Sequence, residues 1–203
     1  MSTAHARRDS VCLVLAAGLG RRMGGPKALM DVGGRPWWRW QVERLEAAGM
    51  ASVWVVNDAV IRGMEVHPEA PRACCRADAT APMFHSLMGG IRSLGSIPAF
   101  VHVLPVDVPC PKATTFASLE RGAGMGAAVP TRACSRGHPV CLAGPWIARH
   151  LLDASGTSES RLDVLIRGST TEVEIPDDPD ATVNLNTSRD VEAWLATWSS
   201  SDA

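Results

Sequence analysis

The residues of this chain best suited to chemistry lie near its start, in the stretch LAAGLGRRMGGPKALM (15–30). Glycines at 18, 20, 24 and 25 are combined there with two adjacent arginines and a lysine, directly after an apolar run. A glycine-rich turn between a strand and a helix exposes backbone N–H groups that can approach a phosphate closely. The stretch therefore predicts a loop that binds a phosphorylated ligand.

Two common phosphate-binding motifs do not describe this loop. The Walker motif places Gly-Lys-Ser/Thr in a row, whereas Lys27 follows a proline and precedes an alanine. The dinucleotide motif G-x-G-x-x-G is matched by Gly18 and Gly20, but Met23 stands where the third glycine belongs. The loop must therefore bind phosphate in another way.

The loop resembles the signature L-A-A-G-x-G-x-R-M-G-x-x-K of nucleotidyltransferases that activate small phosphates with an NTP. The matching residues are Leu15, Ala16, Ala17, Gly18, Gly20, Arg22, Met23, Gly24 and Lys27. Further similar segments follow in the order of that family: APMFHSLMGGI (81–91), LPVDVP (104–109), RGHPV (136–140) and NLNTSRDVEAW (184–194). Over about residues 10–198 the chain resembles the MobA-like NTP transferases, in particular the molybdenum cofactor cytidylyltransferases.

The resemblance implies a Mg²⁺-dependent reaction in which an acceptor phosphate attacks the α-phosphorus of an NTP and releases pyrophosphate. It favours CTP as the nucleotide, a molybdopterin-type cofactor as the acceptor and a molybdoenzyme as recipient of the product. Two alternatives stay open at this point. One is transfer to a sugar phosphate or phosphorylated alcohol, and the other is a non-catalytic protein that binds a nucleotide or the cofactor.

Nucleotidyl transfer depends on positioning and neutralising a triphosphate more than on acid–base groups. The resemblance assigns nucleotide contacts to Leu15, Ala16, Ala17, Gly18, Gly20 and Ser86. Arg22 and Lys27 are expected to supply positive charge to the leaving pyrophosphate, and Lys27 suits a terminal phosphate because it is a compact point charge. Arg21 is expected to face solvent.

Asp107 and Asn186 are the candidate metal ligands. Asp107 follows the carboxyl end of a predicted strand, where open α/β sheets bind ligands, and carboxylate oxygens suit Mg²⁺. An aspartate beside proline also commonly caps a turn. Cofactor-transferring relatives often carry Asp-Ile-Asp-Thr where this chain reads Asn-Leu-Asn-Thr (184–187), so Asn186 offers a neutral oxygen in place of a carboxylate.

The histidines have different expected roles. His138, together with Arg136, lies in the RGHPV segment and is expected to bind the acceptor phosphate. His102 falls inside an apolar strand, which is typical of a core histidine with a hydrogen-bond partner. No histidine or cysteine spacing indicates a zinc site.

Strand-like and helix-like segments alternate along the chain. Apolar runs predict strands at 11–16, 52–57, 100–104, 126–130 and 171–175. Helical spacing predicts helices over about 36–49, 82–95, 111–121, 145–154 and 160–167, and a last helix capped by Ser188. This order predicts an α/β fold with a doubly wound, mainly parallel sheet and helices on both faces, and the resemblance to the MobA-like family implies that the domain is Rossmann-like. We expect one domain over 11–198, with tails at 1–10 and 199–203.

Composition excludes several classes of protein. The 203 residues are 46% hydrophobic and carry 20 basic and 21 acidic side chains, a balance that lacks the broad positive face nucleic-acid binding requires. No apolar stretch approaches the roughly 20 residues of a membrane-spanning helix. The six cysteines show no metal or disulfide spacing and are expected to be free thiols, as in a cytoplasmic protein.

Overall fold

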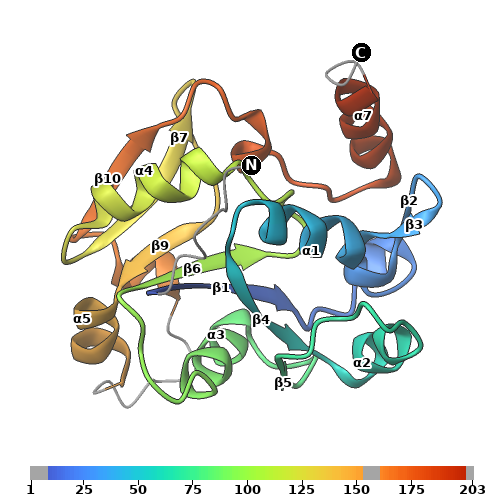
Figure 1. The fold of residues 1–203 in the computed structure, drawn as a ribbon, viewed down its shortest axis with the longest axis horizontal. Helices are drawn as coiled ribbons and strands as arrows, with labels where there is room; N and C mark the ends of the chain where they lie inside the picture. The colour runs from blue at the N-terminus through green and yellow to red at the C-terminus, as the bar shows by residue number, and fades with distance from the viewer. Residues whose placement is uncertain (1–8, 153–160, 200–203) are drawn as a thin grey trace, which may run out of the picture.

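The computed structural model describes residues 9–152 and 161–199. Most of the two expected tails lies outside these ranges. Within the described residues, eight strands form one sheet in the order β10-β7-β9-β6-β1-β4-β5, with β8 beside β7 (Figure 1). Its strands are β1 (Ser10–Ala16), β4 (Ala51–Val56), β5 (Cys74–Arg76), β6 (Phe100–Pro105), β7 (Ala127–Arg132), β8 (Ser135–Arg136), β9 (Val140–Ala143) and β10 (Thr170–Glu174). A separate two-stranded ribbon joins β2 (Asp31–Val32) to β3 (Arg35–Pro36).

The sheet is mainly parallel, as the sequence predicts. Strand β1 pairs in parallel with both β4 and β6, and β10 pairs in parallel with β7. Strand β9 is the exception, because it runs antiparallel to β6 and β7. Only residues 133–139 separate β7 from β9, and a segment that short cannot hold the crossover helix that a parallel return needs.

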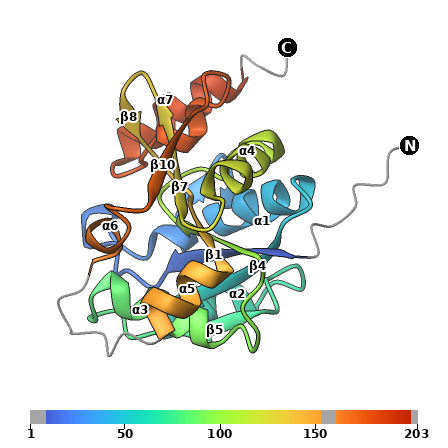
Figure 2. The ribbon, with the colours of Figure 1, turned by 90° about the vertical axis from the view of Figure 1, so that its left-hand side faces the viewer.

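Helices cover both faces of the sheet (Figures 1 and 2). One face is covered by α1 (Trp37–Ala47), α2 (Asp58–Glu65), α4 (Ala113–Ala123) and α7 (Ser188–Ser199). The other face is covered by α3 (Met83–Arg92), α5 (Gly144–Ile147) with a π-helical turn at Ala148–Leu152, and α6 (Leu162–Leu165). Short 3₁₀ turns lie at Arg21–Met23, Lys27–Leu29 and Pro179–Thr182. The expected doubly wound fold is confirmed.

Strand β1 is buried along its whole length. Cys12 and Val14 pack in the core on the α1 side, whereas Val11 and Leu13 pack on the α3 side. This division follows from the alternation of side chains along a strand. It explains why the run reads as continuously apolar in the sequence.

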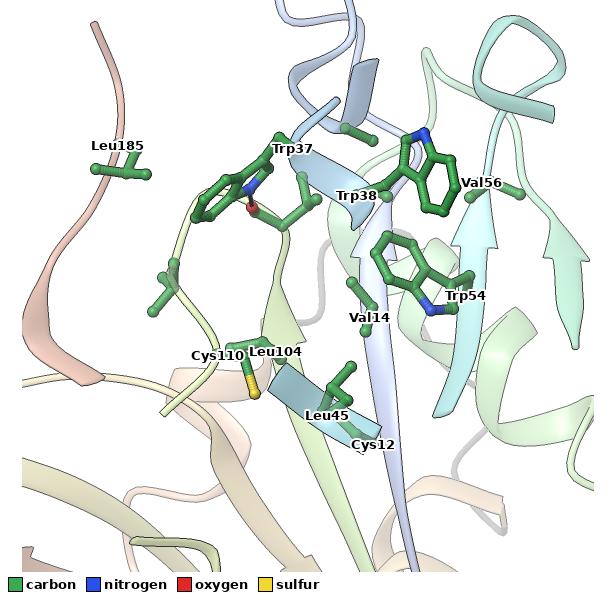
Figure 3. Packing of buried hydrophobic residues seen from close by; sticks show 14 of the residues in the cluster. Cys12, Val14, Trp37, Trp38, Leu45, Trp54, Val56, Leu104, Cys110 and Leu185 are labelled. Carbon is green, nitrogen blue, oxygen red and sulfur yellow. Dashed lines mark hydrogen bonds between the residues drawn. The ribbon is translucent and has the colours of Figure 1, made fainter. Parts of the chain in front are cut away.

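Helix α1 packs one side against the core, and that side is not purely apolar. Trp37, Trp38, Gln41 and Leu45 are almost fully buried, so the hidden face includes a polar glutamine. Figure 3 shows Trp37 and Trp38 packed among the core side chains beside the strands. Trp40 is half-buried, and the Arg35 guanidinium lies over its ring at 4.0 Å.

Three further local features differ from expectation. Helix α2 and strand β5 were not predicted, because residues 58–76 carry no long periodic apolar pattern. The cap of the last helix is Thr187 and not Ser188: the Thr187 hydroxyl oxygen accepts a hydrogen bond from the Asp190 backbone N–H at 3.2 Å. The segment predicted as a helix over 145–154 is described to residue 152 and lies beyond the described residues after that.

The six cysteines are all unpaired, as expected. Cys12, Cys110 and Cys141 are buried, and burial raises the pKa of the Cys110 thiol to about 12, so these groups act as small apolar side chains. In the part of the chain that the structure describes, none of the helices has the length and apolar character needed to cross a bilayer.

Candidate functional site

The glycine-rich loop leaves β1 at the carboxyl edge of the sheet. Gly20 has a φ of +60°, and a Cβ placed there would lie 1.8 Å from the Gly25 carbonyl oxygen. The Gly20 carbonyl in turn accepts hydrogen bonds from the N–H groups of Met23 and Gly25. Only glycine therefore fits at position 20, where the chain folds back tightly toward Lys27.

A buried asparagine holds the start of this loop. Asn57, at the end of β4 and only 5% exposed, donates from Nδ2 to the Ala17 carbonyl oxygen at 2.8 Å. Its Oδ1 accepts from the Val60 N–H at 3.0 Å, which caps α2. One side chain thus ties the loop after β1 to the first turn of the helix after β4.

Lys27, Asp107 and Asn186 meet at one point, although they are far apart in the sequence. The Lys27 ammonium donates to Asp107 Oδ2 at 2.9 Å and to Asn186 Oδ1 at 2.8 Å. The side chains of Lys27 and Asp107 are 17% and 28% exposed, so the ion pair is only partly screened by water. The structure thus brings these three residues, each singled out from the sequence, into contact.

Backbone contacts fix the segment that carries Asn186. The Leu185 N–H donates to the Asp107 carbonyl oxygen at 2.7 Å, which fastens this segment to the turn after β6. Asp190 Oδ2 accepts from the N–H groups of Asn186 and Thr187, at 2.9 and 2.8 Å. Hydrogen bonds from Thr187 and Asn186, with the nearby Lys27 charge, lower the pKa of the Asp190 carboxyl, so it stays ionised beside the site.

A cavity of about 220 Å³, the first cavity, opens between the glycine-rich loop and the start of α3. Five of the predicted nucleotide contacts line it: Leu15, Ala17, Gly18, Gly20 and Ser86. Lys27 and Asp107 also lie in its wall. Ser86 is 6% exposed and lies on the inward side of α3. Asp78 also lines the cavity, and hydrogen bonds from the Thr80 N–H and hydroxyl lower the pKa of its carboxyl.

A second cavity, of about 550 Å³, adjoins the first. The two share Leu15, Met83 and Pro105 in their walls. Most of the second lining is apolar and comes from α3, the central strands and α6: Leu15, Pro82, Met83, Phe84, Leu87, Val103, Pro105, Val129, Val140, Leu162 and Ile166. Arg136, His138, Arg161 and Asp163 add its charged and polar groups.

The two predicted acceptor residues lie in this second cavity. The Arg136 guanidinium forms an exposed ion pair with Glu172, with Nε donating to Oε1 at 2.7 Å. His138 Nδ1 is buried and has no hydrogen-bond partner within the described residues. Burial lowers the pKa of the His138 imidazole, and the Asp107 carboxylate opposes that shift, so His138 is neutral near pH 7.

Other predicted residues are placed as follows. The Ala16 side chain packs into the core beside α1, so only its backbone faces the ligand edge. Arg22 belongs to the 3₁₀ turn Arg21–Met23, but its side chain is outside the described part of the structure, and Arg21 is exposed as expected. His102 is the expected core histidine, with Nε2 3.1 Å from Glu120 Oε1.

The MobA-like NTP transferase domain matches residues 12–173 of this sequence. The chain belongs to the MobA-like NTP transferase family. A molybdenum cofactor guanylyltransferase from Cereibacter sphaeroides is 30% identical over 193 residues, which cover 88% of this chain and 92% of that protein. The chain is therefore a nucleotidyltransferase of this family.

Solved structures show the same fold for this MobA-like transferase. The crystal structure of an rv0371c homolog from Mycobacterium sp. strain JC1 superimposes with a TM-score of 0.74 at 21% identity, covering 93% of this chain and 96% of that one. Molybdopterin-guanine dinucleotide biosynthesis protein A from Archaeoglobus fulgidus gives a TM-score of 0.71 at 18% identity, covering 93% and 98%. At these identities the likeness establishes the fold alone.

The donor set of this transferase suits a hard cation. Asp107 and Asn186 present a carboxylate and an amide oxygen, the ligand types that Mg²⁺ takes, and an ammonium ion already lies between them. Within residues 9–152 and 161–199 no three or more His, Cys, Asp or Glu side chains gather as a metal site. A Mg²⁺ ion held here would therefore complete its coordination with water molecules or nucleotide phosphates.

Sequence reasoning missed Asp78, Asn57 and Asp190. Asp78 lies in an irregular segment without a motif. Asn57, by contrast, ends a predicted strand with a good helix-capping residue, a signal that could have revealed α2. Asp190 stands three residues after Thr187, the spacing of a capping box, which could have indicated how Asn186 is held.

Proposed function

We propose that this MobA-like transferase moves a nucleoside monophosphate from an NTP to the phosphate of a molybdopterin-type cofactor, with Mg²⁺, and releases pyrophosphate. A cytoplasmic molybdoenzyme would receive the product. The observation that carries the proposal is the pair of adjoining cavities, with Asp107 in the wall of the first and His138 in the wall of the second. Two substrates bound side by side would meet where the cavities join.

The lining of the second cavity supports a molybdopterin-type acceptor over a sugar phosphate. A sugar phosphate exposes many hydroxyl groups, each of which needs a polar partner when buried. The apolar walls, with Leu87, Val103 and Val140 among them, offer few such partners. They suit a flat ring system, with its phosphate directed to the polar end beside His138.

The reaction needs charge neutralisation and alignment. An oxygen of the acceptor phosphate forms a new bond to the α-phosphorus, while the bond from that phosphorus to the bridging oxygen breaks and pyrophosphate leaves. Lys27 would stabilise the negative charge that develops on the leaving pyrophosphate, and the backbone amides of Gly18 and Gly20 would bind the nucleotide. Mg²⁺ bound at Asp107 and Asn186 would supply further positive charge at the phosphates.

The neutral His138 would orient the acceptor. Its Nδ1, buried and without a protein partner among the described residues, can share a hydrogen bond with an acceptor phosphate. Arg136 stands at the same cavity, where it could exchange its exposed partner Glu172 for a phosphate. Neither residue is required to remove a proton, because a phosphate monoester is already largely dianionic at neutral pH.

CTP is the nucleotide we propose, and GTP is the second candidate. The first cavity, at about 220 Å³, is smaller than the roughly 300–1,000 Å³ of most ligand pockets, which favours the smaller pyrimidine base. GTP is supported by the guanylyltransferase relative and by Asp78. The Asp78 carboxylate could accept hydrogen bonds from both N–H donors on one edge of guanine, whereas cytosine offers a single amino group there.

The test is a pyrophosphate-release assay with each of the four common NTPs. Each NTP is supplied with purified molybdopterin cofactor, with glucose 1-phosphate or with no acceptor, in Mg²⁺ or in EDTA. We expect release only with CTP, cofactor and Mg²⁺ together, and mass spectrometry should detect the cytidylylated cofactor. Turnover with GTP in place of CTP would identify GTP as the nucleotide substrate. Turnover with the sugar phosphate, or NTP binding without any turnover, would overturn it.

A further inference from the structure

The turn that carries Asp107 has almost no regular backbone pairing of its own. Residues 105–111 contain three prolines, which lack N–H donors, and the turn lies between the end of β6 and the start of α4. Its flanking residues Val106, Val108 and Cys110 are buried, at 8%, 1% and 0% exposed. Buried carbonyl groups in such a turn need donors from elsewhere in the molecule.

Gln41 supplies most of these partners from the neighbouring helix. Its Nε2 donates to the carbonyl oxygens of Val108 at 2.7 Å and Val106 at 3.3 Å, while its Oε1 accepts from the Cys110 N–H at 2.7 Å. Trp37, one turn earlier on α1, donates from Nε1 to the same Val106 oxygen at 2.5 Å. Side chains of α1 thus hydrogen-bond to the backbone both before and after Asp107 in the chain.

The Asp107 carbonyl group connects the turn to the segment of the other metal-ligand candidate. The Asp107 carbonyl oxygen accepts from the Leu185 N–H, which lies next to Asn186 in the chain. Figure 3 shows Trp37 between the segment that carries Leu185 and the strands of the core. Any shift of the turn would therefore move Asp107 relative to both Lys27 and Asn186.

We propose that Gln41 is a positioning residue for the reaction: through Val106, Val108 and Cys110 it holds the Asp107 carboxylate at the distance that Lys27 and a metal ion require. Gln41 is fully buried and lines neither cavity among the described residues, so it acts without touching a substrate. The inference rests on the proposed role of Asp107 as a metal ligand. Groups that orient a metal ligand commonly change metal affinity or activity by about 10–100-fold when they are lost.

The decisive variant is Gln41→Met, which keeps the length of the side chain and removes all three hydrogen bonds. We expect Mn²⁺ affinity in the presence of a non-hydrolysable CTP analogue, measured by electron paramagnetic resonance, to fall by about 10–100-fold. Hydrogen exchange at the Cys110 amide should become faster, because its acceptor is gone. Trp37→Phe, which removes only one donor to Val106, should give a smaller loss of affinity.

Leu119→Ala is the matched control. Leu119 is fully buried in α4, in a core cluster that includes none of these turn residues, so its truncation lowers stability without releasing the turn. If Gln41→Met and Leu119→Ala melt at similarly reduced temperatures and only the former loses Mn²⁺ affinity, the positioning role holds. Unchanged Mn²⁺ affinity in folded Gln41→Met and Trp37→Phe variants would overturn it. Absence of Mn²⁺ binding by the wild-type protein with nucleotide would instead refute the proposed metal role of Asp107.

Discussion

Replacing Lys27 with methionine should move metal affinity and catalysis in opposite directions. The Lys27 ammonium lies 2.9 Å from Asp107 Oδ2 and 2.8 Å from Asn186 Oδ1, the two oxygens proposed for the metal. A cation that binds these oxygens must first displace this ammonium ion. Methionine has a similar length but no charge, so it leaves the oxygens free.

The size of the effect follows mainly from the part-buried contact with Asp107, because the contact with Asn186 is exposed to solvent. A hydrogen bond to a charged group is worth about 1.5–3 kcal/mol, which is the cost of breaking the pair before a metal binds. Because about 1.4 kcal/mol corresponds to a tenfold change in affinity, Lys27→Met should bind Mn²⁺ about 10–100-fold more tightly than wild type without nucleotide. The same change removes charge at the pyrophosphate and should lower kcat/KM by about 10²–10³-fold.

The assay is a titration with Mn²⁺ in which the free ion is followed by electron paramagnetic resonance. Arg21→Met serves as the control, because it removes one positive charge from an exposed side chain in the same loop. Its Mn²⁺ affinity should stay within about threefold of wild type, since exposed charges are screened by solvent. Equal Mn²⁺ affinity in Lys27→Met and wild type would refute the idea that lysine and metal compete for the same oxygens.

Three further outcomes test the site. Asp107→Asn should nearly abolish pyrophosphate release, whereas Asn186→Asp should remain active and bind Mn²⁺ more tightly because it adds a carboxylate. Equal losses of activity in the two variants would contradict these roles. Gly20→Ala should abolish nucleotide binding, measured by calorimetry, because the added Cβ would clash with the Gly25 carbonyl oxygen. Gly25→Ala is the control: a Cβ there meets nothing within 4 Å, so this variant should fold with a melting temperature close to that of wild type. Burial lowers the pKa of the His138 imidazole, so as the pH falls the unfolded state takes up a proton before the folded state does. This residue therefore contributes stability above about pH 6.5 that is lost as the pH falls through the pKa of the folded state. Denaturant titrations should show that His138→Gln loses less stability in acid than wild type does, and an unchanged dependence of stability on pH would contradict the shift.

Part of the proposed site follows from the fold class that the sequence predicts. In a parallel sheet the carboxyl ends of neighbouring strands lie along one edge, so a loop after β1 and a turn after β6 must be close together. Lys27 and Asp107 belong to those two connections. Their meeting follows from the pairing of β1 with β6, whereas the alternation of apolar runs and helices predicts a parallel sheet without fixing its strand order.

The contacts that position these residues could not be predicted in the same way. Gln41 is polar, so the sequence gives no reason to place it in the core. Its hydrogen-bond partners are backbone groups of a turn about 65 residues later in the chain, and only the folded structure brings them together. Trp38 and Trp40 are both suited to burial, and only the packing of α1 against the sheet decides between them. The antiparallel course of β9 likewise depends on pairing with distant strands.

The neutral side chain at position 186 has an evolutionary consequence. Among the described residues, Asn186 contributes to the cation contact and to neither cavity wall. An asparagine codon becomes an aspartate codon by a single base change, so selection can add or remove a negative charge here in one step. The metal affinity proposed for this site could therefore change in one mutational step while the residues that line the two cavities stay unaltered.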